Sequence, residues 1–118
     1  MYSDKDPAFV KLEDDEEGIH FGLFENNKLI SVGSWFRRNE LEAQFRKLAT
    51  VEQFRNMGFG TLLLSHIIEF SKTEKIKTLW CNARVDALNF YKRKGFTETD
   101  TVFTKGGIDY VIVQLDLY

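Results

Sequence analysis

Residues 50–61 contain the pattern that decides the fold, a strand end followed by a glycine-rich turn and a helix start: Thr50-Val51-Glu52-Gln53-Phe54-Arg55-Asn56-Met57-Gly58-Phe59-Gly60-Thr61. Backbone N–H groups in the first turn of a helix lack partners within the helix and carry partial positive charge. Glycines let a ligand approach those groups without a Cβ in the way. The stretch therefore predicts an anion site suited to a phosphate or pyrophosphate, to which Arg55 adds a cation and Thr61 a hydroxyl.

Two phosphate-binding loops do not fit this stretch. A nucleotide P-loop closes with Gly-Lys-Ser/Thr, and no lysine follows Gly60. A dinucleotide-binding loop follows the first strand of a parallel unit and has an acidic residue downstream. Glu74 stands at a suitable distance, but this loop follows the third strand of an apparent antiparallel meander. Taken alone, the stretch also fits an ordinary glycine-rich helix cap.

The rest of the chain predicts one mixed sheet with helical crossovers. Apolar runs separated by turn residues predict strands over 18–24, 28–36, 43–51, 77–81, 97–103 and 108–117, and apolar residues at helical spacing predict helices over about 58–72 and around Val85 to Tyr91. Residues 1–17 are polar and lack a sustained period, so we expect a lead-in there and a single domain over 18–118. The fold class is α/β (α+β mixed sheet): an antiparallel meander, then helix–strand–helix, then a C-terminal strand pair.

Composition excludes several function classes. The formal net charge is -2, without a strongly basic field, which argues against nucleic-acid binding. No apolar run approaches the ~18–20 residues that span a bilayer, so we expect no membrane association. Cys81 is the single cysteine, which excludes an intrachain disulfide and fits a reducing cytoplasm. Because this cysteine and the two histidines are scattered along the chain, we expect no metal site.

A second stretch follows the predicted strand at 77–81: Asn82-Ala83-Arg84-Val85-Asp86-Ala87-Leu88-Asn89-Phe90-Tyr91-Lys92-Arg93-Lys94-Gly95-Phe96. Together with the first stretch, it resembles the GNAT superfamily of acyl-CoA N-acyltransferases. The family has an Arg/Gln-x-x-Gly-x-Gly/Ala loop after a Leu-Ala-Val strand, and an Asn-x-x-Ala-x-x-Phe-Tyr-x-x-x-Gly-Phe segment. This chain has Thr50 in place of the valine, and Ala87 lies five residues after Asn82 rather than three.

The resemblance implies an N-acetyltransferase that uses acetyl-CoA as co-substrate and a primary amine of a small molecule or protein as acceptor. It implies that the backbone of Leu48, Ala49 and Thr50 pairs with the pantetheine arm. The amides that would hold the pyrophosphate are those of Arg55, Asn56, Met57, Gly58, Phe59, Gly60 and Thr61. Asn82, Asn89 and Arg93 would make further cofactor contacts. Tyr91 matches the family tyrosine near the thioester sulfur, where it would act as general acid for the departing thiolate.

Other residues have plainer interpretations beside their functional ones. From periodicity alone, Tyr91 reads as a core aromatic and Cys81 as a buried, inert thiol. His20 reads as a structural histidine, although its ordinary pKa range suits a base, and Glu42 as a surface carboxylate that could act through water. Arg46 and Tyr110 are candidates for an acceptor site. Trp35 and Trp80 read as core or cleft-wall residues.

The N-terminal region departs from the family pattern. Members usually place a strand and one or two helices before the hairpin that begins near Gly18, so we expect the first strand and first helix to be missing here. Phe9, Val10 and Leu12 could form a short strand. An uncovered sheet edge favours association, so we expect a possible homodimer. The alternatives are a catalytically degenerate CoA-binding or interaction module of the same fold, and a nucleotide-binding regulatory domain.

Overall fold

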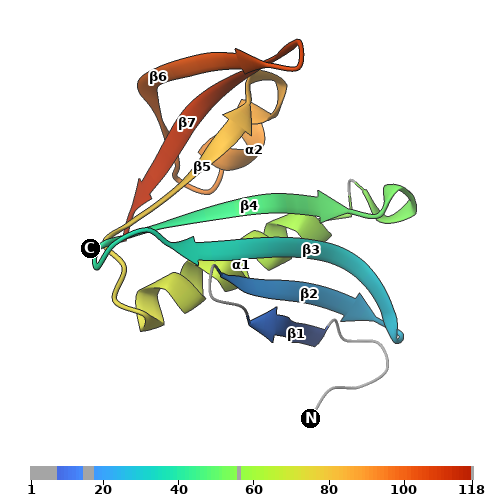
Figure 1. Ribbon diagram of the computed structural model, residues 1–118. Helices are drawn as coiled ribbons and strands as arrows, with labels where there is room; N and C mark the ends of the chain where they lie inside the picture. Colours follow the sequence, from blue (N-terminus) through green and yellow to red (C-terminus); the bar gives the residue numbers. More distant parts are fainter. Residues whose placement is uncertain (1–7, 15–17, 56, 118) are drawn as a thin grey trace.

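The computed structural model describes residues 8–14, 18–55 and 57–117, which form one seven-stranded sheet with helices packed against it (Figure 1). The strands are β1 (Ala8–Asp14), β2 (Ile19–Glu25), β3 (Lys28–Arg37), β4 (Glu42–Thr50), β5 (Thr78–Arg84), β6 (Thr97–Lys105) and β7 (Ile108–Asp116). The helices are α1 (Phe59–Thr73) and α2 (Leu88–Lys92), each preceded by a short 3-10 turn, Glu52–Phe54 and Val85–Ala87 respectively. The predicted fold class is confirmed, and so is the predicted order of elements from β2 onward.

The sheet order is β1-β2-β3-β4-β5-β7-β6. Neighbouring strands from β1 to β4 are antiparallel, β4 and β5 are parallel, and β7 pairs antiparallel with both β5 and β6. The parallel pair is the consequence of a crossover through α1, because a helix must return the chain to the starting end of the next strand. This crossover carries the glycine-rich turn.

The expected lead-in over residues 1–17 is corrected in part. Ala8–Asp14 forms the edge strand β1 and pairs antiparallel with β2, from Ala8 opposite Phe24 to Asp14 opposite Ile19. The expectation that the first strand is missing is therefore wrong, and the alternative that Phe9, Val10 and Leu12 form a short strand is confirmed. The apolar residues Phe9, Val10 and Leu12 do not alternate regularly with polar ones, so the segment shows no clear strand period by itself, and pairing with β2 decides the outcome. Residues 1–7 and 15–17 lie outside the described residues. Among the described residues, no α-helix precedes α1.

The core lies between α1 and the strands β2, β3 and β4. Helix α1 buries Phe59, Leu63, Leu64, Ile67 and Ile68 on one face, as the helical spacing of these residues requires. Its C-terminal half is fixed to β3 by a buried hydrogen bond of 2.9 Å from Trp35 Nε1 to Ser71 Oγ. A Cβ on Gly33 would lie 3.0 Å from Ile67 Cδ1, so this glycine permits the close approach of α1 to β3.

The two halves of the sheet diverge after a short parallel contact. Strand β4 pairs with β5 only at Glu42, Ala43 and Gln44, opposite Thr78, Leu79 and Trp80. Beyond this point β4 runs on to Thr50 beside β3, while β5 runs on to Arg84 beside β7. Figure 1 shows β5, β6 and β7 rising away from β4, with α2 on their side of the gap. The gap exposes one backbone edge of β4.

No helix in the part of the chain that the structure describes is long and apolar enough to cross a membrane.

Candidate functional site

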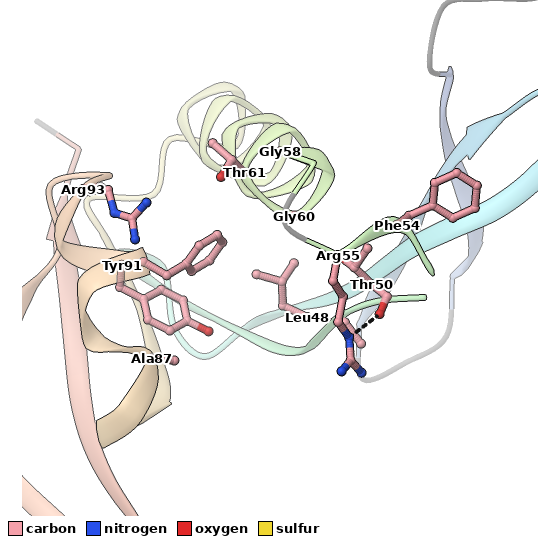
Figure 2. A pocket seen from close by; sticks show the side chains of 12 residues that line it. Leu48, Thr50, Phe54, Arg55, Gly58, Gly60, Thr61, Ala87, Tyr91 and Arg93 are labelled. Atoms are coloured by element: carbon pink, nitrogen blue, oxygen red, sulfur yellow. Dashed lines mark hydrogen bonds between the residues drawn. The ribbon is translucent and has the colours of Figure 1, made fainter. Parts of the chain in front are cut away.

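A cavity of about 560 Å³ occupies the gap between the diverging strands. It is lined by Leu48, Ala49, Thr50, Phe54, Arg55, Gly58, Gly60, Thr61, Ala87, Phe90, Tyr91 and Arg93. These residues come from β4, from the turn that leads into α1, and from the α2 region. Figure 2 shows the start of α1 facing the segment that carries Tyr91 and Arg93, with Leu48 between Tyr91 and Thr50. We call this cavity the donor pocket.

The first wall of the donor pocket is the free edge of β4. Its opposite edge pairs with β3, where Val32 faces Ala49 and Ser31 faces Thr50. The register slips between Val32 and Ser34, where β4 has one residue more than β3. Lys47 lies in this bulge and has a φ of 59°. Such a bulge bends a strand and redirects its backbone groups. From Phe45 onward the other edge of β4 has no strand partner among the described residues, which leaves N–H and C=O groups directed at the gap.

The second wall is the turn before α1. Gly58 caps the helix with a φ of 86°, a conformation that favours glycine. Arg55 Nε donates a hydrogen bond of 3.2 Å to the carbonyl oxygen of Thr50, which ties the turn to the end of β4 (Figure 2). The N–H groups at the start of a helix of 15 residues lack acceptors within it, so this end attracts anions. The cations Arg55 and Arg93 line the same pocket.

The absence of a Cβ at Gly60 affects how closely a ligand can approach the start of α1. A Cβ there would lie 3.4 Å from Thr50 Oγ1 and 3.8 Å from Phe90 Cζ, both on residues that line the pocket. The absence of a side chain at Gly60 therefore widens the space between the helix start and the facing segment. A phosphate-bearing group fits this arrangement of helix N–H groups, cations and glycines.

The third wall carries Tyr91, which an aromatic cluster holds in place. Its ring centroid lies 5.0 Å from that of Phe90, and 5.9 Å from those of Phe45 and Phe96. Burial, the nearby Cys81 and a hydrogen bond with that thiol raise the pKa of Tyr91 well above its usual range. The hydroxyl therefore keeps its proton through neutral pH and can donate a hydrogen bond.

Cys81 lies on β5 behind Tyr91 and is 2% exposed. Burial raises the pKa of the Cys81 thiol to about 12, and the hydrogen bond with Tyr91 opposes this only in part. A thiol that stays protonated at neutral pH is a poor nucleophile. Its buried position agrees with the inert interpretation, and its contact is with the pocket-lining tyrosine.

The predicted cofactor-binding residues divide into two groups. The structure brings nine of them together around the donor pocket: Leu48, Ala49, Thr50, Arg55, Gly58, Gly60, Thr61, Tyr91 and Arg93. Met57 is exposed, Phe59 is buried in the core, and neither Asn82 nor Asn89 lines the pocket. Asn56 lies outside the described residues. Roles for Met57 and Phe59 through the backbone, and for Asn82 and Asn89, stay predictions.

Sequence reasoning missed three residues of the pocket lining, Phe54, Ala87 and Phe90. Ala87 and Phe90 stand inside the Asn82–Phe96 stretch, so their motif positions carried the signal. Phe54 lies in the 3-10 turn Glu52–Phe54 and packs edge-on against Phe59, with ring centroids 5.8 Å apart. Nothing in its sequence neighbourhood distinguishes it from a core aromatic.

A second, smaller cavity of about 240 Å³ lies on the other side of the same gap. It is lined by Gln44, Phe45, Arg46, Lys47, Asn82, Phe103, Lys105 and Tyr110, and we call it the cationic cavity. Arg46 and Tyr110, the candidates for an acceptor site, are brought together here, and Asn82 lies with them rather than in the donor pocket.

The remaining candidates lie away from both cavities. His20 Nδ1 is 2.8 Å from Ser34 Oγ on the neighbouring strand, and Glu42 Oε1 accepts a hydrogen bond of 2.8 Å from Asn39 Nδ2. Trp35 is a core residue, and Trp80 is half-buried. Among the described residues, no group of three or more His, Cys, Asp or Glu side chains gathers as a metal site would.

Comparison with known proteins gives a consistent result. A family model described as acetyltransferase (GNAT) domain matches residues 5–117. The chain is 32% identical over 109 residues to the uncharacterized N-acetyltransferase YitI of Bacillus subtilis, covering 86% of this chain and 73% of that protein. It is 32% identical over 93 residues to the [ribosomal protein bS18]-alanine N-acetyltransferase of Haemophilus influenzae, covering 77% of this chain but only 63% of that protein.

The fold agrees with a solved structure. A GNAT family acetyltransferase from Elizabethkingia anophelis with acetyl-CoA bound superposes with a TM-score of 0.76 at 21% identity, covering 86% of this chain and 77% of that one. The family match spans both the turn before α1 and the segment that carries Tyr91. The chain therefore belongs to the GNAT family of acetyltransferases.

Proposed function

We propose that the protein is an N-acetyltransferase that moves the acetyl group of acetyl-CoA directly to a primary amine. The observation that carries this proposal is the donor pocket itself, because an anion-binding helix start, a free strand edge and a protonated phenol line one cavity. Each of the three matches a different part of an acyl-CoA thioester: diphosphate, amide-containing arm and sulfur. Membership of the GNAT family supports the same reaction.

Different residues of the pocket bind different parts of the donor. The helix start from Gly58 to Thr61, with Arg55 and Arg93, holds the diphosphate. The free edge of β4 at Leu48 to Thr50 hydrogen-bonds the amides of the pantetheine arm, as an added strand would. This arrangement brings the thioester toward the Tyr91 side of the pocket.

The transfer then needs no covalent enzyme intermediate. The neutral amine nitrogen forms a bond to the acetyl carbon, and the carbonyl oxygen becomes an oxyanion that a backbone N–H on the free edge of β4 stabilises. The C–S bond breaks, and sulfur leaves with the electron pair and takes the proton of the Tyr91 hydroxyl. The nitrogen loses its extra proton to water, and solvent returns a proton to Tyr91. The protonated thiol of Cys81 supports direct transfer over a thioester on the enzyme.

The experiment has two readouts on the same purified protein. Calorimetry with acetyl-CoA measures donor binding, and release of free CoA thiol in the presence of a panel of primary amines measures transfer. We expect saturable binding and amine-dependent thiol release. Binding without release for any amine would instead favour a CoA-binding module of the same fold. Absence of binding at millimolar acetyl-CoA would overturn the proposed function altogether.

A further inference from the structure

We propose that the acceptor is a small primary amine that carries an acid group, held in the cationic cavity defined above. The inference rests on the proposed function and assigns the acceptor class for that reaction. It is carried by the placement, the charge and the size of the cavity.

The cationic cavity adjoins the donor pocket across the chain of β4. Arg46 and Lys47 line the cavity, while the next residue, Leu48, lines the donor pocket. On β5, Asn82 lines the cavity and its neighbour Cys81 meets the Tyr91 side chain. The two spaces therefore meet near the end of the pocket where Tyr91 lies. An amine that enters through the cationic cavity approaches the thioester from the side opposite the diphosphate.

The described residues that line the cavity are positively charged overall, and none of them is a carboxylate. The charged ones are Arg46, Lys47 and Lys105. Among the described side chains, ion pairs form at Arg37–Glu74, Lys72–Glu69, Arg84–Asp86 and Lys92–Glu98, and none of them involves a cation of the cavity. Arg46 instead lies over the Phe36 ring, 5.9 Å from its centroid. Unneutralised cations around a cavity favour an anionic ligand.

The register of the β6–β7 hairpin keeps the Asp109 carboxylate off this face. Phe103 is opposite Tyr110 and Thr104 is opposite Asp109. Because side chains alternate between faces, Phe103 and Lys105 share one face and Asp109 lies on the other. There Thr104 Oγ1 donates a hydrogen bond of 2.7 Å to Asp109 Oδ1. The Asp109 carboxylate therefore does not neutralise the positive charge at the cavity.

The size and walls of the cavity favour a small molecule. Its volume of about 240 Å³ is below the ~300–1,000 Å³ of pockets for drug-sized ligands. Phe103 and Tyr110 form a stacked pair, with centroids 5.2 Å apart and an interplanar angle of 14°, which gives the cavity a flat apolar wall. Gln44, 4% exposed, is fixed by a hydrogen bond of 2.9 Å from Arg38 Nε to its Oε1.

The same cations explain how the amine becomes reactive without a dedicated base. An ammonium group among positive charges has a lowered pKa, because neighbouring like charges disfavour the charged form. A simple cationic amine would be repelled from such a cavity. An amine that also carries an acid group is attracted by that group, and its nitrogen is then deprotonated more readily. The positions of His20 and Glu42 outside the cavity agree with this arrangement.

The test compares matched acceptors by thiol release at saturating acetyl-CoA. The pairs are β-alanine with β-alaninamide and 4-aminobutyrate with its amide, together with a neutral peptide that begins with alanine. In each pair the amide has the less basic amine, which by itself favours the amide. We expect kcat/KM to be at least about tenfold higher for the carboxylates, the range of a hydrogen bond to a charged group.

Lys105→Gln and Arg46→Gln serve as the test variants, and Lys28→Gln at the β2–β3 turn serves as the matched control. Each test variant should lose most of the preference for carboxylates while acetyl-CoA binding and turnover of the amides persist, and the control should keep it. Equal or faster turnover of the amides or of the neutral peptide would overturn the inference and leave the proposed function intact. A preference that survives in both variants would overturn it as well. Failure of acetyl-CoA binding would instead overturn the proposed function.

Discussion

The donor pocket and the cationic cavity lie on either side of the Lys47–Leu48 step in β4, yet the chain assembles them in different ways. The donor pocket comes from two compact stretches, residues 48–61 and 87–93. The cationic cavity comes from three separated places, residues 44–47, Asn82, and the hairpin from Phe103 to Tyr110. The difference teaches that the proposed donor site is built from local motifs, whereas the proposed acceptor site is built from side chains that only the fold brings together.

Removing the phenol from the donor pocket should have the largest effect. Tyr91→Phe keeps the ring contacts with Phe45, Phe90 and Phe96 but removes the proton that the leaving thiolate takes. We expect kcat to fall about 100-fold, the lower range of general acid–base contributions. Calorimetry should give an unchanged affinity for acetyl-CoA. An unchanged kcat would exclude Tyr91 as the acid.

Filling the space at Gly60 should weaken donor binding without weakening the fold. A Cβ there projects between Thr50 and Phe90 at ordinary contact distances, and alanine is a better helix former than glycine. Gly60→Ala should therefore lower acetyl-CoA affinity by about tenfold, or 1.4 kcal/mol, while thermal unfolding shows equal or slightly higher stability. Leu62→Ala on the exposed face of α1 is the matched control. Equal affinity in Gly60→Ala and the control would contradict the assigned diphosphate position.

The bulge that separates the two cavities should tolerate glycine at Lys47. A lysine at a φ of 59° is in a sparsely populated conformation, which glycine adopts readily. Lys47→Gly should keep the fold within about 1 kcal/mol, whereas the β-branched Lys47→Val should destabilise it by roughly 1–3 kcal/mol. Chemical denaturation measures both. A reversed order would show that the bulge is not held in this conformation.

The pH profile should show the smallest effect of Tyr91. Because its pKa is raised, the hydroxyl stays protonated above the ordinary tyrosine value of about 10. The rate should rise with pH as the acceptor amine loses its proton. We expect no decrease of kcat at any pH up to about 10. A descending limb near neutral pH that disappears in Tyr91→Phe would mean that this side chain loses its proton there.

The two regions also differ in how far the sequence predicts them. Helical spacing from Phe59 to Phe70 and the turn residues Gly58 and Gly95 were sufficient for the helix positions, because backbone conformation follows local chemistry. The glycine-rich turn and the Asn82–Phe96 stretch likewise placed most of the donor pocket. The edge strand β1 was only an alternative from the sequence, because pairing with β2 stabilises a segment whose own pattern is weak.

Asn82 shows most clearly where prediction from the sequence ends. Its motif position suggested a cofactor contact, which stays a prediction. Strand β5 leaves β4 after Trp80, and Asn82 lines the cationic cavity. The bulge at Lys47 depends on strand register, and the placement of Arg46 and Lys105 at one cavity depends on register and on the divergence of the sheet. Neither has a local pattern in the chain, so only the three-dimensional structure brings these residues to one place.

The most direct test of the central claim is a crystal structure of the protein with acetyl-CoA. We predict the diphosphate at the start of α1 from Gly58 to Thr61, the pantetheine arm along Leu48 to Thr50, and the sulfur within hydrogen-bonding distance of the Tyr91 hydroxyl. Acetyl-CoA bound outside the gap between β4 and β5, or with its sulfur far from Tyr91, would contradict the account.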